Sequence, residues 1–196
     1  PYIPIGLNMI GMGNSSAERG LAQMGEWMEN LAANNGNFVR LWLSNSFWDV
    51  EHEKSGVYDD QKASERLDKI IRKAEDLGLK VKVTLEHFRN FKERGWDAKP
   101  IHDIKNGGTA ANIEDFFRGE ASRKLFLKKL DWYADRYAGN STIFLWELWN
   151  EVNAVSRAGY ALDDASEQFD WTVVMLDALE ERFPERLVTQ SLGSFD

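Results

Sequence analysis

The sequence predicts an α/β fold with a parallel sheet. Short apolar segments alternate with amphipathic segments of helical period along the 196 residues, in the order strand then helix four times and then a fifth strand. Such alternation is typical of parallel strands that are joined by right-handed crossovers. No repeat, low-complexity tract or linker divides the chain, so we expect one domain over residues 1–196.

The first strand and the first helix are expected at residues 3–10 and 15–33. The strand is short and apolar, and Gly11-Met12-Gly13 follows it. This segment lacks the rest of a dinucleotide-binding fingerprint, so we interpret it as a turn. Ser15 and Glu18 have the spacing of a capping box, and the apolar residues of the helix recur at steps of three and four.

The second strand is expected at residues 38–43, where Arg40 interrupts an apolar run. A buried Arg is costly unless an acid pairs with it, so a partner carboxylate is implied. Alternatively, Arg40 occupies an edge position in water. The loop at residues 44–60 is long and carries Trp48, and loops of this size inside a compact domain are often functional.

The third strand is expected at residues 80–85, after a helix whose apolar stripe runs from Ala63 to Leu77. His87 follows the strand, and it is interpreted either as a hydrogen-bonding residue of a site or as a satisfied loop histidine. The remaining segments are expected to be an irregular stretch at 88–119, a helix at 121–137, a strand at 143–149, a helix from Asp163-Asp164 to Pro184 and a strand at 187–192.

The fourth strand is the most informative segment, because its apolar run ends in Asn150-Glu151. In a parallel α/β barrel the active site is built where the strands end, so an acid at this point is a candidate for chemistry. Alternatively, the pair is only the polar start of a loop. Glu147 shares a face with residues 149 and 151 if the strand is regular. We interpret it as a buried structural acid that pairs with Arg40 or another inward base.

The chain has eight Trp and eleven Phe, which is many for its length. Most of these rings are expected to pack in the core. Trp48 and Trp149 lie beside polar residues in the sequence, and the flat apolar faces of sugars stack on such rings. Both are therefore candidate sugar platforms, and core packing is the alternative for each.

The net charge of −8 argues against nucleic acid or an anionic membrane as the main partner. No apolar run approaches the roughly 20 residues of a membrane span. The chain has no cysteine, and its three histidines, His52, His87 and His102, show no metal-ligand spacing. We expect no cofactor and no metal. The first residues include neither Met nor a signal peptide, so a processed or excised piece is expected.

Two segments carry a resemblance to a known family. Trp146-Glu147-Leu148-Trp149-Asn150-Glu151 resembles the acid/base motif of retaining glycoside hydrolases of clan A, and is most similar to that of endo-β-mannanases and other family 5 enzymes. Phe38-Val39-Arg40-Leu41-Trp42 is similar to the second strand of that clan, which carries an active-site Arg. The resemblance implies a TIM (β/α)8 barrel, of which the chain holds about the first five strands and four helices.

The resemblance also implies roles for individual residues. Glu151 would be the general acid/base, Asn150 would bind the 2-hydroxyl of the sugar, and Arg40 would hold the nucleophile ionised. Glu86-His87 lies where many members have a polar residue after the third strand, and His87 would bind the substrate. A glycosidic oxygen leaves poorly unless it is protonated, which explains the need for an acid beside it. The expected substrate is a β-linked oligo- or polysaccharide, mannan- or glucan-like, and secretion is expected from the resemblance alone.

The sequence departs from the family in its length. A full barrel has eight strands, and in clan A the nucleophile, a second Glu, ends the seventh. That region is not among these residues, so the chain alone is expected to be inactive. The missing C-terminal part or a second polypeptide is expected to complete the barrel. A carbohydrate-binding partial barrel without turnover is the alternative from another class, and a metal-assisted barrel enzyme is a third.

Overall fold

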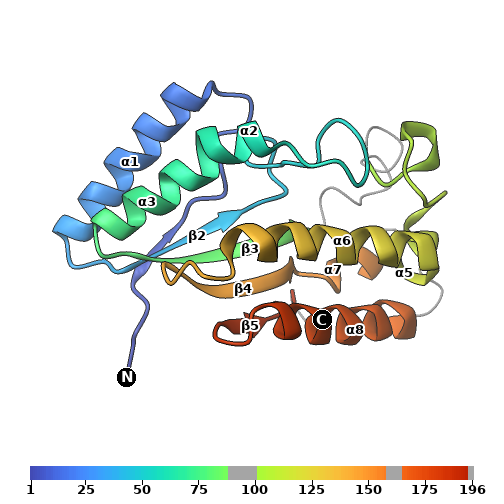
Figure 1. Cartoon of the computed structure of the whole chain (residues 1–196). Helices are drawn as coiled ribbons and strands as arrows, with labels where there is room; N and C mark the ends of the chain where they lie inside the picture. Colours follow the sequence, from blue (N-terminus) through green and yellow to red (C-terminus); the bar gives the residue numbers. More distant parts are fainter. Residues whose placement is uncertain (88–100, 158–164, 194–196) are drawn as a thin grey trace.

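The computed structural model describes residues 1–87, 101–157 and 165–193. Its centre is a parallel sheet in which the strands lie side by side in chain order (Figure 1). The strands are β1 (Gly6–Asn8), β2 (Phe38–Trp42), β3 (Lys80–His87), β4 (Ile143–Asn150) and β5 (Leu187–Thr189). Each strand pairs in parallel with the next. The predicted α/β fold with a parallel sheet is therefore confirmed.

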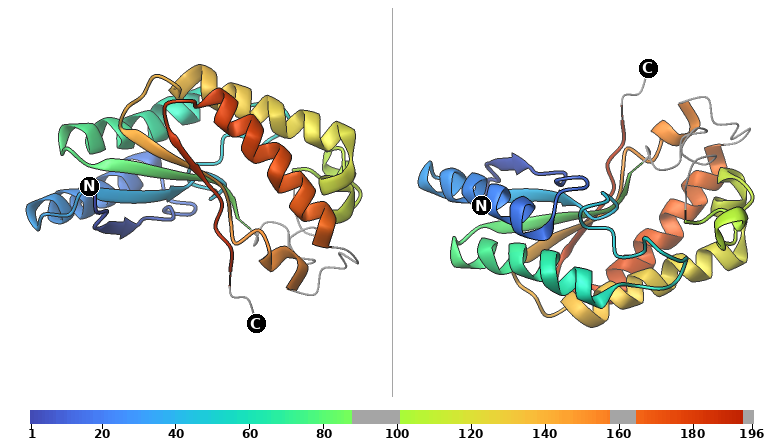
Figure 2. Two further views of the ribbon diagram at one scale, coloured as in Figure 1. Left: turned by 90° about the horizontal axis from the view of Figure 1, so that it is seen from below. Right: turned by 90° about the horizontal axis from the view of Figure 1, so that it is seen from above.

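The connecting helices lie along the outside of the curved sheet, as the two views of Figure 2 show. They are α1 (Ala17–Ala33), α3 (Asp68–Asp76), α6 (Glu120–Tyr137) and α8 (Ala165–Arg182), and the shorter helices are α2 (Asp60–Lys62), α5 (Ile113–Arg118) and α7 (Ala154–Arg157). A π-helical turn, Ala63–Leu67, joins α2 to α3, and a 3-10 turn covers Ile104–Asn106. Within the described ranges, no helix has both the length and the apolarity that a bilayer crossing requires.

The outer face of the sheet is apolar and packs against these helices. Apolar side chains on the outer face of the three central strands are completely inaccessible to solvent, and so are apolar residues of α1 and α6. The strand residues include Val39, Leu41, Val81, Val83, Ile143 and Trp146, and the helix residues include Met24, Met28 and Leu130. Burial of this apolar surface supplies the main driving force for the fold.

The inner face of the sheet is different, because it carries charged and polar side chains. Arg40 on β2, Lys82 and Thr84 on β3 and Glu147 on β4 contact one another there. The paired registers Arg40↔Lys82 and Thr84↔Glu147 place these residues in neighbouring positions of the sheet. The fold thus collects polar groups on one face while the other face forms the core.

The two edge strands expose apolar side chains. Tyr2, Ile3, Ile5 and Leu7 are all exposed at the β1 edge, and Phe169, Val173, Val174 and Leu187 are exposed on α8 and β5. In the described part of the chain, each edge strand has a strand neighbour on one side only. Unpaired parallel edges with apolar flanks are ordinarily covered in stable proteins.

Several predicted boundaries differ from the structure. The cap of α1 is Ser16, whose hydroxyl accepts from the Arg19 amide, so the cap lies one residue after the predicted Ser15. The first strand has three residues instead of the predicted 3–10, because only these pair with β2. β3 continues through His87, so Glu86-His87 belongs to the strand. Of the predicted irregular stretch, residues 88–100 lie outside the described residues, as do Asp163-Asp164.

Candidate active site

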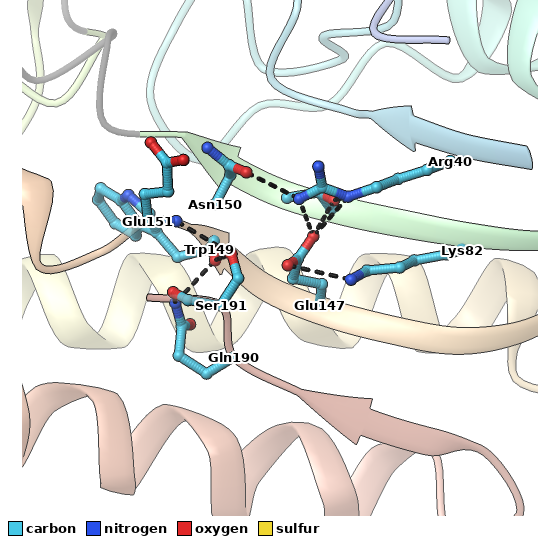
Figure 3. A network of polar contacts seen from close by, with 9 residues as sticks. Arg40, Lys82, Glu147, Trp149, Asn150, Glu151, Gln190 and Ser191 are labelled. Carbon is cyan, nitrogen blue, oxygen red and sulfur yellow. Dashed lines mark hydrogen bonds and ion pairs between the residues drawn. The ribbon is translucent and has the colours of Figure 1, made fainter. Parts of the chain in front are cut away.

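Arg40 is the centre of a polar network on the inner face of the sheet. Its Nε donates to Glu147 Oε2 at 2.9 Å and to Thr84 Oγ1 at 3.1 Å. Its Nη2 donates to the same Glu147 oxygen and, at 2.8 Å, to Asn150 Oδ1. Lys82 Nζ lies 3.1 Å from the other Glu147 oxygen. Figure 3 shows how the network joins β2, β3 and β4.

The carboxyl of Glu147 is fully buried but well compensated. Burial alone raises its pKa, yet hydrogen bonds from Thr84 and Arg40 and the charges of Arg40 and Lys82 outweigh burial, so the pKa lies below its usual value. Glu147 is therefore the ionised partner of Arg40. The predicted need for an acid beside Arg40 is confirmed, and so is the structural reading of Glu147.

Asn150 and Glu151 lie at the carboxyl end of β4. Asn150 is 6% exposed, and its side-chain oxygen is occupied by Arg40. Glu151 is the first residue after the strand, is partly exposed, and has a φ of 56°, which places a non-glycine residue in the left-handed region. Figure 3 shows the two side chains on the same side of the strand end.

His87 lies beside Asn150, because the two residues are paired in the β3–β4 register. The residue is 7% exposed, and the centroid of its ring lies 5.2 Å from that of Trp42. The topology thus brings His87, Asn150, Glu151 and Arg40 to one end of the sheet. These are four of the six residues that the sequence singled out for the site.

The other two are Trp48 and Trp149, and the proposal that they serve as sugar platforms is wrong for this structure. Trp149 is fully buried, and its ring packs against Phe117 and Trp171 at centroid distances of 5.9 and 5.5 Å. Trp48 is 1% exposed and donates from Nε1 to the Ile10 carbonyl at 3.0 Å. Neither ring has a free face on which a sugar could stack.

Trp149 faces the helices because the alternation of side chains along β4 is interrupted between Glu147 and Trp149. Glu147 points to the inner face, and a regular strand would direct residue 149 to the same face. Instead, Trp149 packs against rings from α5 and α8 on the outer side. β3 changes face at the same level, because Thr84 contacts Glu147 whereas Glu86 contacts Lys129 of α6.

A second charged cluster lies between the end of β3 and α6. Lys129 Nζ is 2.5 Å from Glu86 Oε1 and 3.3 Å from Glu51 Oε2, and all three side chains are buried. Burial raises the pKa of Glu86 to about 7, although the Lys129 charge lowers it. Because Glu86 faces the helix layer, it is not a partner for Glu151.

Four residues at the site were not predicted, and the first is Thr84, whose hydroxyl donates to Glu147. Lys82 interrupts an apolar strand as Arg40 does, and this pattern could have identified it. Gln190 and Ser191 follow β5 and bind the backbone around Glu151 (Figure 3). No local pattern marks them, because their role depends on the pairing of β5 with β4. In the part of the chain that the structure describes, no three His, Asp or Glu side chains are grouped as metal ligands would be.

Comparison with protein families matches residues 6–181 to the family described as cellulase, glycosyl hydrolase family 5. A comparison with curated protein sequences gave no match. Among solved structures, the endo-β-1,4-mannanase from Thermotoga petrophila is similar, with a TM-score of 0.65 at 21% identity over 95% of this chain and 43% of that chain.

Two further structures show the same likeness. The endo-1,4-β-mannanase from Rhizomucor miehei has a TM-score of 0.65 at 20% identity, over 91% of this chain and 55% of that chain. A GH5_18 protein from Streptomyces cattleya in complex with GlcNAc has a TM-score of 0.63 at 18% identity, over 89% of this chain and 40% of that chain. At these identities the likeness shows the fold.

The chain spans about half the length of the structures that it resembles. Its five parallel strands with outer helices correspond to part of a TIM barrel, which agrees with the predicted fold. The match over residues 6–181, together with this fold, shows that the chain belongs to glycosyl hydrolase family 5.

Proposed function

We propose that the chain is the part of a retaining β-glycan hydrolase that carries the general acid/base, Glu151. The observation that supports this role is the position of Glu151 at the carboxyl end of β4, directly after an asparagine whose oxygen is held by Arg40 at 2.8 Å. Catalytic groups of TIM barrels lie at the carboxyl ends of the strands. A mannan- or glucan-like substrate is proposed from family membership and from the mannanases of similar fold.

The polar groups around Glu151 suit glycoside cleavage. A carboxylic acid beside the glycosidic oxygen can protonate the leaving group and later activate the attacking water. Because Asn150 accepts from Arg40 through its oxygen, its amide nitrogen is left to donate to a sugar hydroxyl. We propose that His87, which is paired with Asn150 in the sheet, binds a neighbouring hydroxyl.

A retaining mechanism also requires a nucleophile, with its carboxyl about 5 Å from that of the acid. Glu147 is bound by Arg40, Lys82 and Thr84, and Glu86 is bound by Lys129. We therefore propose that the nucleophile comes from polypeptide beyond these 196 residues, and that Arg40 helps to keep it ionised. On this proposal the 196 residues alone have little or no hydrolase activity.

The same additional polypeptide would complete the barrel. The edges at β1 and β5 carry exposed apolar residues, of which Ile3 is 69% exposed and Leu187 is 60% exposed. Further strands with their helices, from a C-terminal part or from a second chain, would bury these groups and close the sheet. Degradation of a polymer outside the cell is part of this proposal.

The test is the substitution Glu151→Gln in the shortest form of the protein that cleaves mannan or cellulose. Turnover should fall by roughly 100-fold or more, because general acid–base catalysis contributes about that much. Glu185→Gln is the matched control, since that side chain is exposed and precedes β5, at the opposite end of the parallel sheet from Glu151. Unchanged turnover in Glu151→Gln would contradict the acid role. Retained binding of oligosaccharide without turnover in every form would instead favour a carbohydrate-binding module.

Efficient turnover by the isolated 196 residues would contradict a different part of the proposal. It would show that the nucleophile lies within the chain, and substitution of the remaining acids in turn would then identify it. The assay on the isolated chain therefore precedes the assay on any longer or two-chain form.

A further inference from the structure

The residues that follow β5 hold the backbone that carries Glu151. We propose that Ser191 is a positioning residue for this acid and that Gln190 assists it. The inference rests on the proposed function, because it matters for catalysis only if Glu151 donates the proton. Ser191 acts through Glu151, since its hydroxyl is engaged by the main chain of the β4 end.

The conformation of Glu151 calls for such support. Its φ of 56° is one that L side chains rarely adopt. A residue in such a region keeps its conformation only when the surrounding structure fixes it. Figure 3 shows the Glu151 side chain standing out from the end of β4. Loss of the conformation would therefore move the carboxyl group as well as relax the backbone.

Ser191 bridges the two peptide groups of this turn. Its Oγ accepts from the Glu151 amide at 3.1 Å and donates to the Trp149 carbonyl at 3.3 Å. One hydroxyl thus satisfies a donor and an acceptor that flank Asn150. Gln190 Nε2 donates to the same Trp149 carbonyl at 2.7 Å and to the Ser191 carbonyl at 2.5 Å, which fixes the bridge from the other side.

The side chains of Gln190 and Ser191 supply hydrogen bonds to β4 beyond the last backbone pair between β4 and β5. The last register pair between β4 and β5 is Glu147↔Thr189. Beyond it, Gln190 and Ser191 bond to Trp149 and Glu151 through side-chain atoms in place of backbone atoms. The β5 end therefore fixes how β4 turns after it leaves the ladder, and that turn fixes the acid.

Gly193 lies next to the Glu151 side chain. A Cβ at this glycine would lie 3.6 Å from both Cβ and Cγ of Glu151. The Gly193 amide donates to Asn153 Oδ1 at 2.6 Å, which joins the segment to the residues after the acid. The chain after β5 thus contacts Trp149, Glu151 itself and Asn153.

The first readout is the hydrogen exchange of the Glu151 amide in the 196-residue chain, measured by NMR. Ser191→Ala should raise the exchange rate at least about tenfold, because the amide loses its acceptor. Ser191→Thr should restore protection, since it keeps the hydroxyl. Ser64→Ala is the matched control, because that serine also bonds a main-chain carbonyl but lies in the π-helical turn between α2 and α3.

The second readout is kinetic, in the form of the protein that cleaves the polysaccharide. Ser191→Ala should lower kcat by roughly 10- to 100-fold with KM within about twofold, since a misplaced acid slows chemistry without weakening sugar binding. Ser191→Thr should recover most of kcat. If Ser191→Ala fails to fold, Ser191→Cys keeps the side-chain volume with a weaker hydrogen-bonding group and provides the same comparison.

The outcomes separate this inference from the proposed function. If Glu151→Gln abolishes turnover while Ser191→Ala leaves both kcat and amide exchange unchanged, the positioning role is overturned and the acid role stands. If Glu151→Gln leaves turnover intact, the proposed function is wrong and the positioning role falls with it. Faster exchange together with a kcat loss that Ser191→Thr reverses supports both.

Discussion

Arg40 on β2 donates a hydrogen bond of 2.8 Å from Nη2 to the side-chain oxygen of Asn150 at the end of β4. The same guanidinium is held by Glu147, two strands away, through Nε at 2.9 Å. A buried carboxylate thus anchors the cation that orients the asparagine beside Glu151. The sheet order and register produce this geometry, since Arg40, Thr84 and Glu147 lie on three successive strands.

Arg40→Met should destabilise the chain by about 3 kcal/mol, because it leaves Glu147 buried with Lys82 and Thr84 as its remaining partners. The double variant with Glu147→Met should be less destabilised than the sum of the two single variants, since the unpaired charge is then absent. Urea unfolding of the three variants measures the coupling. Additive losses would show that the pair contributes little.

Glu86 should make stability depend on pH between about 4.5 and 7. Burial raises its pKa in the folded chain from 4.5 to about 7, so in this window the folded state binds a proton that the unfolded state has released. The favourable contribution of this proton binding to the free energy of unfolding is complete below the unfolded pKa. It is lost as pH rises through the folded pKa.

Glu86→Gln should therefore flatten the decline in unfolding free energy between pH 5 and pH 8. Lys129 keeps Glu51 as a partner in this variant, at 3.3 Å, so the cluster retains an ion pair. Urea unfolding of both proteins at the two pH values measures the difference. Equal pH dependence in the two proteins would mean that Glu86 is ionised throughout this range.

Glu151→Gly should stabilise the chain by about 0.5–1 kcal/mol, because glycine adopts a φ of 56° without the steric cost that a side chain imposes. Asn35 is the control, as its φ is 62° at an exposed position after α1. Asparagine tolerates this region better, so Asn35→Gly should change stability less. Thermal unfolding compares the two. No gain in Glu151→Gly would mean that the turn is unstrained.

The parts of the fold that depend on local pattern could be predicted from the sequence. The end of α1 at Ala33 follows from Asn34-Asn35-Gly36, and the acid at the end of β4 follows from an apolar run that stops at Asn150. The need for a carboxylate beside Arg40 also follows from the cost of a buried charge. Each of these predictions uses information from a single segment.

The parts that depend on two segments could not be predicted. Trp149 faces α5 and α8 because β3 and β4 both change face between the pairs Thr84↔Glu147 and Glu86↔Trp149. A single strand cannot show such a change. Trp48 is likewise buried, and its indole bonds the carbonyl of Ile10, which is 38 positions away in the sequence. Ser191 reaches Glu151 across 40 positions of sequence, so its role emerges only from the pairing of β4 with β5.

Two glycines in α1 should respond to the same substitution in opposite ways. Gly25 has room for a methyl group, since a Cβ there would lie at an ordinary contact distance of 3.8 Å from Lys73 Cε. Gly25→Ala should stabilise the chain by about 0.5–1 kcal/mol, because alanine loses less backbone freedom in a helix. Gly20 packs against a ring, and a Cβ there would lie 2.3 Å from Phe47 Cε2.

Gly20→Ala should therefore destabilise the chain by about 1–3 kcal/mol, because the forced shift of Phe47 outweighs the gain in helix propensity. Phe47 is fully buried and its ring lies 4.6 Å from that of Trp48, so the shift would disturb the loop after β2. Urea unfolding of both variants measures the difference in stability, and Trp fluorescence reports a change in the surroundings of Trp48 in this loop. A stabilised Gly20→Ala variant would show that Phe47 does not pack on α1 as the structure has it.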